Sequence, residues 1–203
     1  MPSLPHTKVS RTEWIDAALQ ALTDQPIDQL KVLVLADTLG VARSSFYWYF
    51  SDRDELLAAL LDIWEHNTAS IVERSGRTSA SVASAVLGVF ECWADDRLYN
   101  PVLDLAVRDW GRRDEAIAAR VQHADDERVA ALTAMFGRHG FTDADALVRA
   151  RLLYHSQVGY YAVGTAETVA TRLGYVPQYL RAMTGTDATQ DELEAFEAFL
   201  NAR

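Results

Sequence analysis

The chain has 203 residues, of which 49% are hydrophobic and 24% charged, with a formal net charge of −10. It has a single cysteine, Cys92, which excludes an internal disulfide framework and suits the cytosol. We expect a cytoplasmic protein without a membrane partner, because no apolar run approaches transmembrane length and the first residues lack the apolar centre of a signal peptide.

The first capping signal is Ser10-Arg-Thr-Glu13, and it predicts a helix over residues 11–23. Apolar residues then recur at helical spacing, so one face of this helix should point inward. The residues expected on that face are Trp14, Ile15, Ala18, Leu19 and Leu22.

The next segment predicts two short helices separated by a tight turn. Leu33, Ala36 and Leu39 recur every third residue and predict one apolar face. Gly40 suits the turn because a positive φ favours glycine. A second helix is expected over about 43–49, with Phe46 buried. This pattern indicates a helix-turn-helix, whose second helix enters the major groove of DNA.

Donors and flat rings dominate the other face of the predicted second helix, and they suit phosphates and base edges. The residues predicted to contact DNA are Lys8, Arg43, Ser44, Ser45, Tyr47, Trp48, Tyr49 and Arg53. Lys8 and Arg53 are expected on phosphates. The run Ser51-Asp-Arg-Asp54 reads as a capping box that begins a long helix near residue 52. The free amides at the start of that helix, with Arg53 beside them, suit a phosphate.

The rest of the chain predicts helices and few other elements, so the expected fold class is all-α. Apolar periodicity places these helices at about 52–74, 80–95, 101–110, 114–138 and 142–163, with a last one ending near 200. Thr142-Asp-Ala-Asp145 and Thr189-Gln-Asp-Glu192 read as capping boxes. Residues 165–188 give the weakest pattern, with a possible helix over 172–179 interrupted by Pro177.

The helix-turn-helix stretch resembles the tetracycline-repressor (TetR/AcrR) family of bacterial transcription regulators. The similarity covers roughly residues 10–60 and rests on Leu35-Ala36, Leu39-Gly40-Val41-Ala42, Tyr47-Trp48-Tyr49-Phe50 and Arg53-Asp54-Glu55-Leu56. Two positions depart from the family pattern. Ala42 replaces the serine that usually caps the recognition helix, and Arg53 replaces a lysine but keeps its charge.

The resemblance implies a DNA-binding domain over 1–52 and a ligand-binding and dimerisation domain over 53–203, with the helix 52–74 connecting them. It also implies a homodimer, which suits a two-fold operator. We expect the helix 142–163 and the last helix, with Phe196 and Phe199, to form the dimer interface. The alternative is that the last helix only seals its own core.

The resemblance further implies a small-molecule cavity among the helices between residues 80 and 163. The residues predicted to line it are Trp93, Leu103, Val107, Trp110, Tyr154, Gln157 and Tyr161. Rings dominate this set, so we expect a neutral, aromatic or fatty effector. An anionic effector would need Arg108, which is expected to pair with Asp104 four residues earlier. For any one of these aromatic residues, the alternative is ordinary core packing.

Known enzyme motifs and histidine pairs at metal-ligand spacing are missing from the sequence, so we expect no enzyme activity, cofactor or metal site. The predicted function is a transcriptional regulator, specifically a repressor released from a palindromic operator by its effector. One observation opposes DNA binding: residues 1–60 carry five basic and eight acidic side chains. The alternative is therefore a helical small-molecule-binding protein or enzyme that has lost DNA binding.

Overall fold

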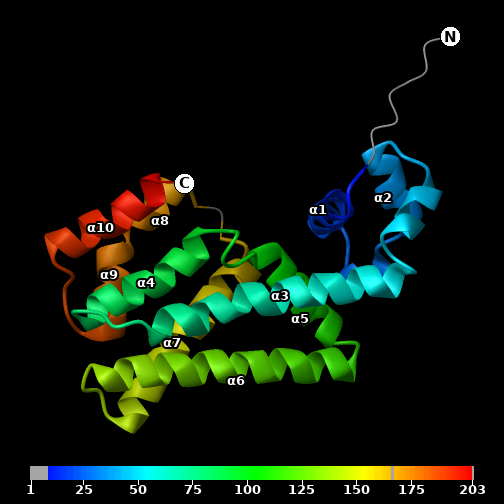
Figure 1. Ribbon diagram of the computed structural model, residues 1–203. Coiled ribbons are helices and arrows are strands. Elements are labelled where there is room, and N and C mark those ends of the chain that lie inside the picture. The colour runs from blue at the N-terminus through cyan, green and yellow to red at the C-terminus, as the bar shows by residue number, and fades with distance from the viewer. Residues whose placement is uncertain (1–8, 166, 203) are drawn as a thin grey trace. The chain divides into compact units, whose positions relative to one another are not determined.

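The computed structural model describes residues 9–165 and 167–202, and over these ranges every regular element is helical, as predicted (Figure 1). Lys8 lies outside the described residues. The elements are α1 (Arg11–Ala21), η1 (Ile27–Gln29), α2 (Val32–Leu39), η2 (Arg43–Trp48), α3 (Arg53–Gly76), α4 (Val82–Ala94), α5 (Pro101–Gly111), α6 (Glu115–Arg138), α7 (Asp143–Val163), α8 (Val169–Gly174), α9 (Val176–Thr184) and α10 (Gln190–Asn201), where η marks a 3₁₀-helix.

The chain divides into two compact units. The first contains the residues up to Glu65 together with Val102–Ala118, and the second contains His66–Pro101 together with the residues from Ala119 onward. The first unit thus includes α5 and the first half of α3, which the sequence-based boundary at residue 52 would assign to the C-terminal domain. Within the described ranges, no helix has the length and apolar character needed to cross a membrane.

An aromatic cluster forms the centre of the helix-turn-helix segment. Phe46 is fully buried, lies edge-on to Trp14 at 5.2 Å between ring centroids, and stacks on Phe50 at 5.1 Å. These contacts join α1 to the residues that follow the turn, at a distance where aromatic pairs attract each other. The predicted burial of Phe46 is confirmed, and Phe50 is buried beside it.

The predicted apolar face of α2 is confirmed at Ala36, with Leu39 half-buried, but it is wrong at Leu33. Leu33 is 57% exposed, whereas Val32, Leu35 and Ala36 are buried. Because α2 begins at Val32, its inward face follows positions i, i+3 and i+4 from that residue. Gly40 ends the helix with φ +66°, so the predicted glycine turn is confirmed.

The second helix of the motif is a 3₁₀-helix, where an α-helix was predicted. The carbonyl of Ala42 accepts the Ser45 amide at 2.9 Å, an i to i+3 bond that tightens this turn. Ala42 also has no side-chain oxygen for a cap, and the Ser45 hydroxyl donates to the same carbonyl at 2.8 Å. The departure from the family's usual serine therefore coincides with a change in local geometry.

The capping signals differ in outcome. The Ser10–Glu13 and Thr189–Glu192 boxes are present as predicted, but Thr142 makes no side-chain cap bond. The box at the start of α3 is shifted by one residue. Asp52 accepts the Glu55 amide at 2.9 Å, and Glu55 accepts the Ser51 amide at 2.7 Å.

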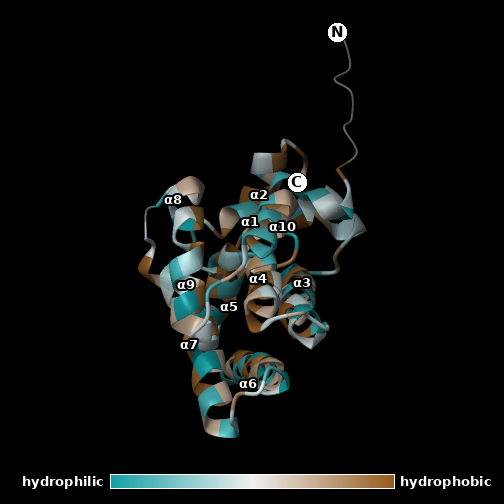
Figure 2. Cartoon of the chain, turned by 90° about the vertical axis from the view of Figure 1, so that its left-hand side faces the viewer, coloured by the Kyte–Doolittle hydropathy of each residue, from teal (hydrophilic) through white to brown (hydrophobic). Residues whose placement is uncertain are grey.

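The second unit is built around α4, whose residues are largely buried. The last helix, α10, packs on α4, with the rings of Phe90 and Phe196 6.4 Å apart. The weakly patterned stretch 165–188 contains two short helices, α8 and α9. Pro177 stands in the first turn of α9, where a proline is tolerated, so it does not interrupt a helix. Figure 2 shows hydrophobic and hydrophilic bands alternating along α7.

Candidate DNA-binding and effector sites

The outer surface of η2 carries most of the residues predicted to contact DNA. Arg43, Ser44, Tyr47 and Trp48 are exposed, and Ser45 and Tyr49 are half-buried. Trp48 is 71% exposed, an unusual position for an indole unless it meets a partner.

Arg43 and Tyr47 lie one turn apart and hold each other in place. The guanidinium Nη2 donates to the Tyr47 hydroxyl at 2.9 Å, and the guanidinium carbon lies 5.8 Å from the ring centroid. The phenolic proton and the remaining guanidinium donors can then point outward together. Such a pair suits phosphate oxygens or the acceptor edge of a guanine.

The Arg53 side chain donates hydrogen bonds to main-chain carbonyls of its own unit. Its Nε donates to the Leu30 carbonyl at 2.7 Å, and its Nη2 donates to the carbonyls of Ile27, at 3.3 Å, and Asp28. The guanidinium thereby joins the start of α3 to the end of η1. A lysine has no planar fork and could not bond these oxygens in the same way. A phosphate contact of Arg53 remains a prediction, and it would compete with these bonds.

A buried polar chain links α3 to α5 in the first unit. Asp104, 1% exposed, accepts the indole N–H of Trp64 at 2.8 Å and the Nε of Arg108 at 2.7 Å. The predicted pairing of Asp104 with Arg108 is confirmed. Arg113, just after α5, donates to the carboxylate of Asp28 at 3.0 Å and so reaches η1.

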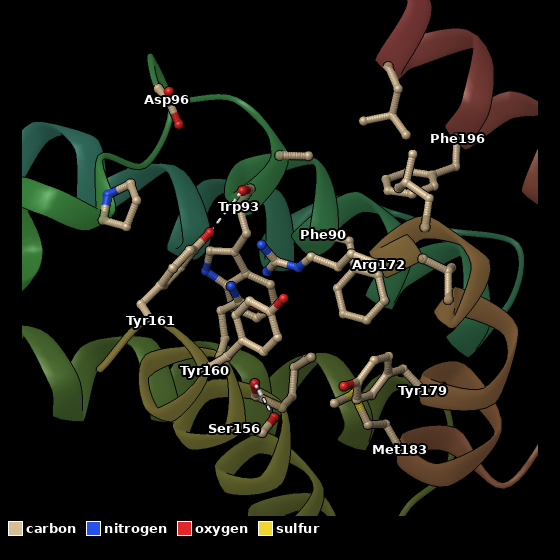
Figure 3. A pocket seen from close by; sticks show the side chains of 17 residues that line it. Phe90, Trp93, Asp96, Ser156, Tyr160, Tyr161, Arg172, Tyr179, Met183 and Phe196 are labelled. Carbon is tan, nitrogen blue, oxygen red and sulfur yellow. Dashed lines mark hydrogen bonds between the residues drawn. The ribbon is translucent and has the colours of Figure 1, made fainter. Parts of the chain in front are cut away.

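The second unit encloses a cavity of about 400 Å³ among α4, α7, α8, α9 and α10 (Figure 3). It is lined by Phe90, Trp93, Ala94, Asp96, Pro101, Leu153, Ser156, Gln157, Tyr160, Tyr161, Arg172, Leu173, Val176, Tyr179, Met183, Phe196 and Leu200. Rings and aliphatic side chains supply most of this wall, as in many small-molecule sites.

The comparisons with known proteins identify the helix-turn-helix. Residues 15–60 match the family model described as bacterial regulatory proteins, tetR family. Residues 15–60 thus form a helix-turn-helix of the TetR kind. The chain is also 24% identical over 135 residues to the HTH-type transcriptional regulator BetI of Burkholderia thailandensis, a match that covers 64% of the chain and 68% of the relative.

Solved structures show the same fold over the whole chain. AmtR of Mycobacterium smegmatis has a TM-score of 0.64 at 18% identity, covering 100% of this chain and 97% of AmtR. A transcriptional regulator from Rhodococcus sp. Rha1 has a TM-score of 0.60 at 16% identity, covering 96% and 97%. The predicted family and all-α architecture are confirmed, and the protein is a DNA-binding transcriptional regulator.

Three of the seven residues predicted to bind the effector line the cavity: Trp93, Gln157 and Tyr161. Tyr154 is buried elsewhere, because its hydroxyl donates to Asp125 of α6 at 2.6 Å. The other three predicted residues, Leu103, Val107 and Trp110, are on α5 in the first unit and do not line this cavity.

Sequence reasoning missed much of the cavity wall, including Arg172, Val176, Tyr179 and Met183. Several of these come from α8 and α9, whose short helices give little periodicity. The signal available was a concentration of rings around one arginine between residues 160 and 179. Within the described parts of the chain, no cluster of three or more potential ligands could hold a metal ion.

Proposed function

We propose that this TetR-family protein is a ligand-responsive repressor, released from a palindromic operator by a small molecule bound in the cavity. The observation that carries the proposal is the presence in one chain of a helix-turn-helix with an exposed polar and aromatic face and a separate aromatic cavity. This function would act in the cytoplasm.

A homodimer would position two recognition elements on a two-fold operator. The support comes from α7, which exposes Val148 (54%), Leu152 (53%) and Val163 (80%) along its length. Tyr175, just before α9, and Tyr179 within it are also large and exposed. We propose α7 and α9 as the dimer surface, since isolated protomers rarely expose such rows of apolar residues.

The last helix gives less support to the predicted interface. Phe196 is only 5% exposed, packs beside Phe90 and lines the cavity. Phe199 lies under the guanidinium of Arg74, 5.5 Å from the ring centroid. Both contacts lie within one protomer, so they support the alternative that α10 closes its own core.

Release requires that the effector bind the DNA-incompetent state more tightly than the DNA-bound state. Two helices offer continuous routes from the cavity-bearing unit. The helix α3 contributes to both units, and α5 starts at the cavity-lining Pro101 and ends near Arg113, which bonds Asp28. A shift of either helix would change the position of the recognition elements.

Selection of binding sites from a random duplex library tests the DNA-binding part of the proposal. The purified protein should enrich a palindrome whose half-sites lie about one helical turn apart. Enrichment of no sequence at low salt would contradict it. That result would favour the alternative, a small-molecule-binding protein without DNA binding, which the excess of acids over bases in residues 1–60 supports.

A further inference from the structure

The cavity contains a cation that is not matched by a neighbouring acid. Arg172 of α8 extends among the rings in Figure 3, with its guanidinium carbon 4.2 Å from the Tyr160 ring centroid and 5.3 Å from that of Tyr161. Among the residues that the structure describes, no carboxylate lies within ion-pair distance of Arg172. The two rings stabilise the cation, but they accept no strong hydrogen bond.

Further donors in the same wall also lack acceptors. The Nε1 of Trp93 is buried and makes no hydrogen bond within the described structure, and the buried Nε2 of Gln157 makes none of standard geometry there, although it lies near the Tyr161 hydroxyl. Buried donors are nearly always paired, and an unpaired one is costly. An excess of donors over acceptors at one place indicates an acceptor that the protein itself does not supply.

The Tyr161 hydroxyl lies near two of these donors, Arg172 and Gln157. It donates its proton to the Trp93 carbonyl at 3.0 Å, so its oxygen faces other donors as an acceptor. Burial raises the pKa of Tyr161, while Arg172 and Gln157 act in the opposite direction by stabilising the phenolate form. Both side chains therefore act on the same oxygen.

The acids near the cavity do not neutralise Arg172. Asp96 is exposed on the loop after α4, and Glu167 accepts the Tyr160 hydroxyl at 2.9 Å. The inner part of the wall thus combines one positive charge with aromatic and aliphatic surface. Such a site discriminates ligands by charge as well as by shape.

We propose that the effector is a small carboxylic acid with an aromatic or aliphatic body, its carboxylate held by Arg172 and Gln157. The inference rests on the proposed effector function of this cavity and replaces the expectation of a neutral ligand, which considered only Arg108. A guanidinium meets a carboxylate through two parallel bonds. The Gln157 amide joins them by rotation about its last torsion, which is broad. A phosphate fits the cavity less well than a carboxylate, because it carries up to two negative charges and Arg172 supplies one positive charge.

Calorimetric titration with matched probes tests the inference on the full-length protein. The probes are 3-phenylpropanoate, its neutral amide 3-phenylpropanamide and the cation 3-phenylpropylammonium, with octanoate and octanamide as the aliphatic pair. Each acid should bind about 10- to 100-fold more tightly than its amide, because a charge-assisted bond is lost in the amide. The ammonium probe should bind most weakly.

Two variants assign this preference to the proposed residues. Arg172→Gln should reduce the acid-over-amide ratio to near one. Gln157→Glu is nearly isosteric, so it tests the site even if the first variant folds poorly, and it should weaken acids while sparing amides. Arg181→Gln is the matched control, since Arg181 is 70% exposed and pairs with Asp187, and it should leave the ratio unchanged.

Equal binding of acids and amides, or an acid preference that survives both cavity variants, would overturn the inference. So would failure of both acids to bind the wild-type protein at millimolar concentration. None of these results removes the proposed function, which is judged separately by whether the protein selects an operator and whether any cavity ligand releases it. Loss of operator selection with a retained acid preference would contradict the proposed repressor function and support the inference about the ligand.

Discussion

The helix-turn-helix and the cavity both combine arginines with aromatic rings, but the arginines are in different states. Arg53 donates to three main-chain carbonyls, and Arg43 is joined to the Tyr47 hydroxyl. Arg172 rests on two rings, and no ion pair joins it to a carboxylate of the described residues. Position in a motif therefore does not reveal which charge is available to a ligand; the acceptors around each guanidinium do.

The largest effect should come from removing the aromatic centre of the helix-turn-helix. Phe46→Ala deletes a fully buried ring between Trp14 and Phe50 and should cost about 3–5 kcal/mol of unfolding free energy. Operator binding should be lost while probe binding in the cavity persists. Urea titration followed by both assays measures this. The control is the exposed Trp48→Ala, whose stability should change by no more than about 0.5 kcal/mol. Equal losses in both variants would contradict the assignment.

A charge introduced on α7 should weaken the dimer, and the loss of the dimer should affect operator binding but not the cavity. Leu152→Arg would bury an unpaired cation in the proposed dimer surface and should weaken dimerisation by about 3–5 kcal/mol. Sedimentation velocity should then show monomers that bind probes but not the operator. Val72→Arg, on a less exposed apolar position of α3, should remain dimeric. A Leu152→Arg dimer of wild-type affinity would place the interface elsewhere.

Lysine at the two arginine positions tests the comparison directly. Arg53→Lys keeps the charge but cannot reproduce the forked bonds to Leu30 and Ile27, so it should lose about 1.5–3 kcal/mol of stability. Arg172→Lys should leave thermal stability near the wild-type value, because its guanidinium bonds no main-chain carbonyl in the described structure. The reverse order of stabilities in thermal melts would show that the two roles were assigned wrongly.

The smallest effect concerns acid pH. The Ser51 amide, which donates to Glu55, lowers the pKa of that carboxyl below its ordinary value of 4.5. A lowered folded-state pKa means that the ionised group adds stability above the unfolded pKa and that this stability disappears as pH falls through the folded value. Glu55→Gln should melt slightly below the wild type at pH 7 and level with it near pH 3. A difference that does not change with pH would exclude this cause.

The sequence predicted the local features well and the cavity in part. Gly40 and the Ser10–Glu13 box were predictable because each depends on residues within one turn. Arg172 was not, because α8 has six residues and too little periodicity to place a side chain. The bonds of Arg53 were hidden for another reason: the acceptors are main-chain atoms 23 to 26 positions away.

Those main-chain acceptors affect how this protein can diverge. Substitutions at Ile27, Asp28 or Leu30 change the side chains but keep the carbonyl oxygens that hold Arg53. The contact can therefore persist while its partners drift, so correlated substitutions between homologues would not report it. Only the arginine itself is constrained, and a relative with lysine there must anchor the end of η1 by other means.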